Sequence, residues 1–219
     1  MRGSGMYRKI ERCDVSHIEN NVIPNSEFQL LNASYYEALS TNELAFFAWK
    51  HAFYTVPTIE LITFLKEQIG EEKNVLEIGA GNGFLGKALN IKCTDNKMQD
   101  DPIVKLSYRT TNQPTIIYGA NVEKIDAESA VKKYHPNIVI ASWVTQKYSK
   151  FKEIGNPYGP DLREIVKNCQ KFIFIGNDDT HGWFEIFGLP HRTIKVDGYI
   201  SRAIKPKNNY IYIWYRNNK

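Results

Sequence analysis

One glycine-rich segment constrains the fold of this chain more than any other feature. Residues Val75–Gly86 read Val-Leu-Glu-Ile-Gly-Ala-Gly-Asn-Gly-Phe-Leu-Gly. The apolar start predicts a buried strand, and the residues after Gly83 predict a helix. Alternate glycines permit a tight turn without Cβ atoms, so the backbone can approach a ligand to which the helix offers its free N–H groups. The segment therefore predicts a nucleotide-like ligand between a strand and a helix.

Beyond residue 70, short apolar runs alternate with helical stretches, which is typical of an α/β fold. The predicted parallel strands are Val75–Ile78, Ile91–Thr94, Thr115–Tyr118, Ile138–Ala141 and Phe172–Ile175. The predicted crossover helices are Phe84–Leu89, Asp101–Tyr108, Ala127–Tyr134 and Asp161–Cys169. Because the runs are apolar throughout, we expect a mostly parallel sheet that is covered on both faces.

The two ends of the chain have different patterns. Arg192–Ile204 and Tyr210–Tyr215 are strand-like and are separated by turn residues, which predicts an antiparallel C-terminal hairpin. Residues 43–70 carry apolar side chains at helical spacing and predict two helices that meet near Pro57. The interpretation is an N-terminal helical cap at residues 6–70 and a ligand-binding core at residues 71–219.

Met1–Gly5, ahead of a second methionine, is interpreted as a remnant of an expression vector. The whole chain of 219 residues suits one core. Its content of 42% hydrophobic and 24% charged residues excludes disorder and low-complexity assembly. No apolar stretch approaches the roughly 18 residues that span a bilayer, so we expect a cytoplasmic protein without a membrane partner.

Cysteine and charge content narrow the function classes further. The three cysteines are widely spaced and form no C-x-x-C pair, which argues against a disulfide scaffold and a zinc site. The net charge of +4 falls short of the basic surface of a dedicated nucleic-acid binder. A nucleic-acid substrate is possible, but nothing in the sequence supports it.

The acidic residue Glu77, two positions before Gly79, gives the pattern apolar, acidic, apolar, G-x-G-x-G. This pattern resembles the first motif of the class I S-adenosylmethionine-dependent methyltransferases, and the resemblance extends over Phe53–Tyr215. It implies a Rossmann-like, seven-stranded, mostly parallel sheet and S-adenosylmethionine as cofactor, whose methionine end the acidic side chain helps to hold. Gly81–Gly86 also fits the dinucleotide fingerprint G-x-G-x-x-G, so an NAD(P)-dependent oxidoreductase is an alternative.

The resemblance implies further cofactor contacts. Asp95 ends the second predicted strand, where the family places an acid on the ribose hydroxyls. Asn121 stands where an acid commonly binds the adenine amino group, with Val122 against the ring; Asp126 is the alternative ligand, although an N-cap role is simpler. The implied cofactor-binding set is Tyr54, Glu77, Gly79, Ala80, Gly81, Asn82, Gly83, Asp95, Asn121, Val122, Ser142 and Trp143.

In the same family, the end of the fourth strand faces the transferred methyl group. Here it reads Ser142–Tyr148, Ser-Trp-Val-Thr-Gln-Lys-Tyr, without the motifs of the base-amino, glutamine or cytosine-C5 methylases. Trp143, Lys147 and Tyr148 are the catalytic candidates, and the acceptor is a small molecule or an exposed protein group of unknown identity. The polar loop Asn177–His181 is a candidate substrate contact, and we expect no metal. A non-catalytic nucleotide-binding or interaction protein with this fold is the remaining alternative.

Overall fold

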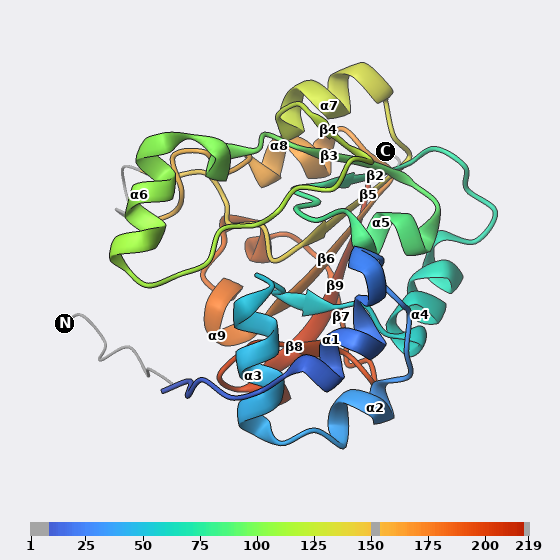
Figure 1. Cartoon of the computed structure of the whole chain (residues 1–219). Coiled ribbons are helices and arrows are strands. Elements are labelled where there is room, and N and C mark those ends of the chain that lie inside the picture. The colour runs from blue at the N-terminus through green and yellow to red at the C-terminus, as the bar shows by residue number, and fades with distance from the viewer. Residues whose placement is uncertain (1–8, 150–153, 217–219) are drawn as a thin grey trace.

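The computed structural model describes residues 9–149 and 154–216, so the prediction for residues 1–5 lies outside the described residues. A seven-stranded sheet with the order β4-β3-β2-β5-β6-β9-β7 forms its centre (Figure 1). The strands of this sheet are β2 (Val75–Ile78), β3 (Lys92–Asp95), β4 (Val122–Lys124), β5 (Ile138–Ser142), β6 (Lys171–Asn177), β7 (Arg192–Ile194) and β9 (Asn209–Tyr215). A separate two-stranded sheet pairs β1 (Thr55–Val56) with β8 (Ile200–Ser201).

Helices precede the sheet and connect its strands. The α-helices are α1 (Ser16–Val22), α2 (Ala33–Glu37), α3 (Thr41–Lys50), α4 (Ile59–Ile69), α5 (Phe84–Leu89), α6 (Pro102–Thr110), α7 (Ala127–Tyr134), α8 (Leu162–Lys167) and α9 (Asp178–His181). The short 3-10 helices are η1 (Pro24–Ser26), η2 (Met98–Asp100), η3 (Glu185–Gly188) and η4 (Pro206–Asn208). Within the described residues, no helix is both long and apolar enough to cross a membrane.

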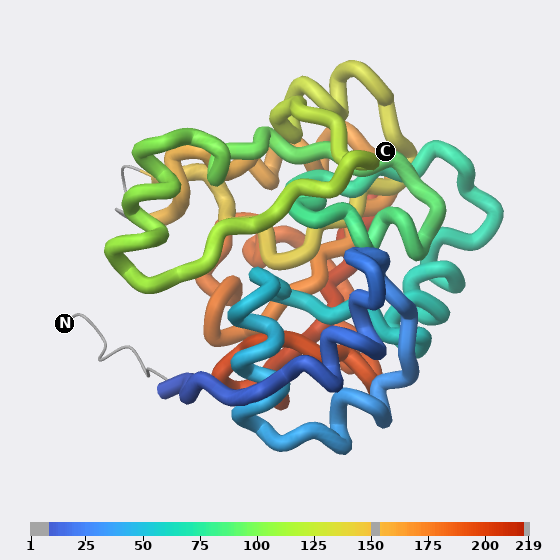
Figure 2. Tube along the Cα trace, viewed as in Figure 1, coloured from blue at the N-terminus to red at the C-terminus, as the bar shows by residue number. Residues whose placement is uncertain are grey.

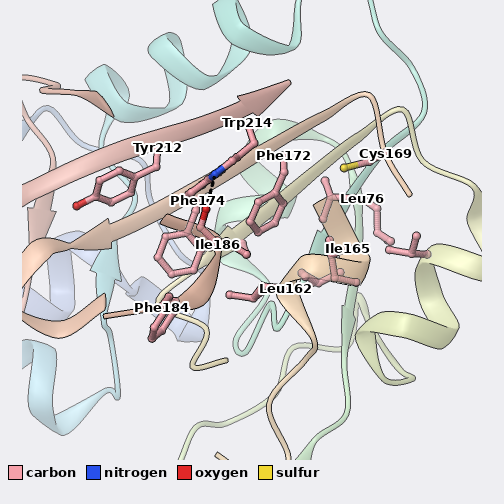
Figure 3. Close-up of a cluster of buried hydrophobic side chains, with 14 of the residues drawn as sticks. Leu76, Leu162, Ile165, Cys169, Phe172, Phe174, Phe184, Ile186, Tyr212 and Trp214 are labelled. Carbon is pink, nitrogen blue, oxygen red and sulfur yellow. Dashed lines mark hydrogen bonds between the residues drawn. The ribbon is translucent and has the colours of Figure 1, made fainter. Parts of the chain in front are cut away.

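Alternate strand residues point to opposite faces of the sheet, and each face has its own core. On one face, Leu76 of β2 and Phe172 of β6 pack against α7 and α8. Figure 3 shows this cluster, in which the indole Nε1 of Trp214 donates to the carbonyl of Ile186, 3.0 Å away. On the other face, Val75 packs against α4 and α5. Burial on both faces explains the continuous apolar runs, and the predicted strand Val75–Ile78 is confirmed.

The third predicted strand is wrong. Thr115–Tyr118 has no strand partner, and β4 lies a few residues later at Val122–Lys124. Thr115–Tyr118 instead belongs to an extended strap, residues 111–121, that runs from α6 to β4 (Figure 2). The strap passes over the glycine-rich turn, where the N–H of Gly119 lies 3.5 Å from the carbonyl of Gly81.

The C-terminal hairpin is confirmed as a pair of antiparallel strands, but its first arm is shorter than predicted. Of the described residues in this predicted arm, only those of β7, Arg192–Ile194, pair with β9. The chain then leaves the sheet to form β8, which pairs with β1 next to the N-terminal helices, before it returns as β9. The remainder of the predicted arm, up to Ile204, therefore links the sheet to the N-terminal segment.

The N-terminal helices α1 to α3 have a small core of their own. Its buried members include Ile18, Tyr36 and Phe47, and Phe84 at the start of α5 packs against it. Helix α4, which the sequence assigned to the cap, packs directly on the sheet with Leu61 and Leu65. The division into a cap at 6–70 and a core at 71–219 stays a prediction, and the packing of the described residues changes before α4 rather than after it.

Candidate active site

The turn between β2 and α5 has the left-handed backbone that its glycines permit. The φ angles are +61° at Gly79, +57° at Gly81 and +71° at Gly83, a region that residues with a Cβ rarely adopt. A Cβ at Gly79 would lie 2.5 Å from Val144, and one at Gly83 would lie 2.6 Å from Val122. A Cβ at Gly81 would meet nothing closer than Ile116, at 3.4 Å. Gly81 is therefore the glycine whose backbone is open to the cleft.

A cleft lies at the carboxyl ends of β2, β3 and β5, where open α/β sheets bind ligands. It encloses about 1220 Å³ of empty space, open solvent included. None of its described lining residues is a lysine or arginine, whereas four are acidic. Its lining includes Tyr54, Thr55, Glu77, Gly79, Ala80, Gly81, Asn82, Asp95, Gln99, Tyr108, Ile116, Tyr118, Asp126, Ala127, Glu128, Ser142, Trp143 and Tyr158. An acidic cleft favours ligands that carry positive charge or hydrogen-bond donors.

Glu77 contributes a buried carboxyl to the wall of this cleft. Its side chain is 2% exposed and accepts hydrogen bonds from the Cys93 thiol, at 3.5 Å, and from the Gly86 N–H. Burial raises its pKa to about 8, and the nearby Asp95 carboxylate adds to the rise. The group therefore retains its proton near neutral pH, and a cation brought next to it would favour its ionised form.

Asp95 ends β3 and holds the glycine-rich turn. Its Oδ2 accepts from the Gly81 N–H at 3.0 Å, and its Oδ1 accepts from the Lys97 N–H at 2.7 Å. Burial raises its pKa, and these two hydrogen bonds oppose the rise. Each carboxylate oxygen has more than one lone pair, so Asp95 retains acceptor capacity for hydroxyl donors in the cleft.

The structure places Asn121 and Val122 outside the cleft. The Asn121 side chain points back to the turn and donates from Nδ2 to the Gly83 carbonyl at 3.0 Å, while Val122 is buried in β4. Because β4 lies later than the sequence predicted, Asp126 and Ala127 follow it and line the cleft instead. Asp126 also caps α7 by accepting from the Ser129 N–H at 2.9 Å. The sequence signal for Asp126 was its place between a short strand and the start of a helix.

The end of β5 meets the N-terminal segment at the opposite end of the cleft. Ser142 donates from Oγ to Oγ1 of Thr55 at 3.0 Å, and Trp143 donates from Nε1 to the Tyr199 hydroxyl at 2.8 Å. Trp143 has a φ of +56°, an unusual conformation for a bulky residue, and such strain clusters at functional sites. Tyr54 lies beside it, with ring centroids 5.9 Å apart.

The other sequence-predicted residues of this region do not line the cleft. Lys147 and Tyr148 are exposed, and the Lys147 backbone N–H donates to the Pro160 carbonyl. His181 is buried, its Nδ1 accepts from the Asn177 N–H at 2.9 Å, and burial lowers its pKa to about 4, which keeps the ring neutral. The polar loop after β6 is thus used for internal hydrogen bonds. Within residues 9–149 and 154–216, no cluster of three metal-ligating side chains occurs.

No protein-family model matches the sequence, and no curated protein matches it. Several solved structures resemble it at low identity. WbdD is 14% identical with a TM-score of 0.38, over 70% of this chain and 38% of that one. A SAM-dependent methyltransferase from Agrobacterium tumefaciens is 8% identical with a TM-score of 0.37, over 70% and 60%. The methyltransferase domain of a bacterial Hen1 is 11% identical with a TM-score of 0.37, over 71% and 95%.

The chain spans less than two thirds of the length of the first two structures. The assignment of the fold rests on the strand order of the chain itself. Strand β9 is antiparallel to both neighbours and lies between β6 and β7, whereas the other six strands run in one direction. The chain has the class I methyltransferase fold. The dinucleotide-binding fold orders its sixth strand directly after the fifth, so the class I fold disfavours the oxidoreductase alternative.

Proposed function

We propose that this protein is an S-adenosylmethionine-dependent methyltransferase. The observation that carries the proposal is the open backbone at Gly81, held by Asp95 and set beside the buried carboxyl of Glu77. The cleft offers carboxylates for the hydroxyl, amino and cationic groups of such a cofactor and has no described lysine or arginine in its lining. This donor and acceptor set fits a cation with ribose hydroxyls, because an anion would be repelled by ionised carboxylates in the lining, such as that of Asp126.

The proposed roles follow the order of groups along the cleft. Asp95 would accept the ribose hydroxyls, and Asp126 with Ala127 would hold the adenine end. Glu77 and the glycine-rich turn, including Ala80 and Asn82, would hold the methionine end, with Tyr54 across from them. Ser142 and Trp143 would face the methyl group. Gly83 supports the turn from behind, and Asn121 supports Gly83.

When bound, the cofactor supplies an electrophilic methyl group on a sulfonium. Transfer is a displacement in which an acceptor lone pair forms the new bond to carbon as the carbon–sulfur bond breaks, and a neutral sulfide leaves. An acceptor that holds a proton releases it to water or to a base. The protein's contribution is positioning and water exclusion, since no described titratable group at the methyl end is poised as an obligatory base.

Calorimetric titration of S-adenosylmethionine, S-adenosylhomocysteine, NADH and NADPH into the purified protein tests the proposal. We expect binding of the first pair alone, together with a rise in melting temperature. Gly81→Val should abolish this binding, because the side chain enters the cleft at a positive φ. Gly188→Val is the matched control, since a Cβ at Gly188 meets nothing within 4 Å. Binding of nicotinamides alone, or of none of the four, would contradict the proposal.

A further inference from the structure

A group of three aromatic side chains lines the cleft beside the end of β5. Tyr54 comes from the segment before β1, Trp143 from the end of β5, and Tyr108 from α6. The rings of Tyr54 and Trp143 are 5.9 Å apart, and the Tyr108 hydroxyl shares a hydrogen bond with Tyr54. Three half-buried rings from different elements form a surface that suits the face or edge of a flat ligand.

Arg202 lies directly against this aromatic group. Its guanidinium carbon is 3.9 Å from the centre of the Tyr54 ring, and its backbone N–H donates to the Tyr54 carbonyl at 3.1 Å. In the described part of the chain, no carboxylate lies within 4 Å of this guanidinium. A half-buried arginine stacked on a tyrosine keeps its donor edge available for a carboxylate or phosphate.

Neighbouring contacts fix these groups in place. Trp143 is held by its hydrogen bond to Tyr199 and by the buried ring of His181, whose centroid is 5.0 Å away. Gln99 donates from Nε2 to the Tyr108 hydroxyl at 3.2 Å. A ligand site whose side chains are already ordered loses little conformational entropy on binding.

We propose that the methyl acceptor is a small molecule with an aromatic ring and an acidic group, its ring packed on Tyr54 and Trp143 and its acid paired with Arg202. This inference rests on the proposed function and specifies its acceptor. The charges around the cleft support it: the described lining carries four acids, Glu77, Asp95, Asp126 and Glu128, and no lysine or arginine, whereas Arg202 brings a cation against the lining residue Tyr54. A nucleic acid would instead require several cations along its backbone.

Binding of three anionic aromatic probes tests this inference: 4-hydroxybenzoate, indole-3-carboxylate and phenyl phosphate. Each is titrated into the protein with and without saturating S-adenosylhomocysteine, and tryptophan fluorescence and calorimetry report binding. We expect at least one to bind, with 4-hydroxybenzamide and cyclohexanecarboxylate at least about tenfold weaker, because each lacks one of the two interactions. If none of the three probes binds, the inference is wrong.

Variants at Arg202 locate the acid-binding group. Arg202→Gln should weaken the anionic probe at least about tenfold and leave the neutral benzamide and S-adenosylhomocysteine unchanged. Arg202→Lys keeps the positive charge but lacks the planar guanidinium, so its affinity for the anionic probe should lie between those of the wild-type protein and Arg202→Gln. Lys207→Gln, an exposed lysine in the turn before β9, is the matched control and should change nothing. If Arg202→Gln and Lys207→Gln lost affinity for the anionic probe equally, the inference would be wrong.

Two results separate this inference from the proposed function. A loss of S-adenosylhomocysteine affinity in Arg202→Gln would make Arg202 a cofactor ligand and refute its role toward the acceptor. Failure of the wild-type protein to bind S-adenosylhomocysteine would refute the proposed function instead. In that case, titration of the probes into the free protein still measures how much Arg202 contributes to binding their acidic group.

Discussion

The charge state of one residue, Glu77, links the stability of this protein to pH. The carboxyl is fully buried within β2, and its pKa is raised to about 8, with burial as the main cause. In the unfolded chain the same group ionises near its ordinary value of 4.5. Between these two values the folded chain keeps a proton that the unfolded chain gives up, so unfolding becomes easier as pH rises.

We therefore predict that the free energy of unfolding falls from pH 5 to pH 8 and that Glu77→Gln removes much of this fall. Each pKa unit corresponds to about 1.4 kcal/mol, so the difference between the two proteins should reach a few kcal/mol. Urea unfolding at both pH values measures it. Glu37→Gln, on the exposed surface of α2, is the control and should retain the wild-type slope. An unchanged slope in Glu77→Gln would contradict this account.

At the scale of elements, α6 differs from the other crossover helices. Asp101 caps it by accepting from the N–H groups of Ile103 and Val104, yet none of its residues is buried. Ile103 is 78% exposed and Leu106 is 60% exposed. The helix projects from the edge of the molecule (Figure 1), so its folding depends on local hydrogen bonds rather than on packing against the sheet.

This exposure predicts a contrast between two identical substitutions. Leu106→Ala should change the free energy of unfolding by less than about 0.5 kcal/mol, because the side chain is largely in water already. Leu61→Ala in α4 should cost about 2 to 5 kcal/mol, because it leaves a cavity under the sheet at a side chain that is 0% exposed. Chemical unfolding of both variants tests the contrast, and equal costs would show that α6 is packed in solution.

The elements also show how far sequence patterns reach. Strands buried on both faces, such as Val75–Ile78, and the glycine-rich turn were predicted correctly. Continuous apolar runs are typical of such strands, and alternate glycines are typical of a tight turn. Thr115–Tyr118 has the composition of a strand, but Ile117 is 87% exposed and the Ile116 N–H donates to the Gln99 side chain. The true edge strand, Val122–Lys124, has one buried residue and no apolar run.

The same error moved part of the candidate site. Because the third strand was placed too early, the predicted adenine contacts were Asn121 and Val122, and Asp126 was only the alternative ligand, with an N-cap role as its simpler interpretation. Lys147 and Tyr148 were predicted near the reaction centre but lie outside the cleft lining, because the chain turns away from the cleft after Thr145. This turn depends on tertiary structure and has no local sequence signal. Arg202 carried no local signal, because its position depends on the pairing of β1 with β8.

At the scale of the whole molecule, segments far apart in the sequence meet next to Pro57, which lines the cleft. The Thr58 hydroxyl, at the start of α4, donates to the carbonyl of Gly198 at 2.8 Å, 140 residues away. Gly198 has a φ of +77°, and a Cβ there would lie 2.8 Å from Ala33 and 2.9 Å from Glu60. Contact at this point is too close for any residue other than glycine.

Gly198→Ala should therefore lower the free energy of unfolding by about 1 to 3 kcal/mol, through backbone strain and the clash with Ala33 and Glu60. Gly188→Ala, where nothing lies within 4 Å, is the matched control and should have a small effect. Thermal unfolding followed by circular dichroism compares them. A Gly198→Ala protein as stable as the control would show that the two segments are not tightly joined.

The pairing of β1 with β8 has a consequence for how such a protein changes over evolution. The N-terminal segment cannot be exchanged for that of another protein unless the segment between β7 and β9 is exchanged with it. Thr55 pairs with Ser201, and the Arg202 guanidinium stacks on the Tyr54 ring. A chimera that exchanges one segment alone would lose the pairing of β1 with β8 and the contact between Tyr54 and Arg202. The two segments should therefore be inherited as a pair.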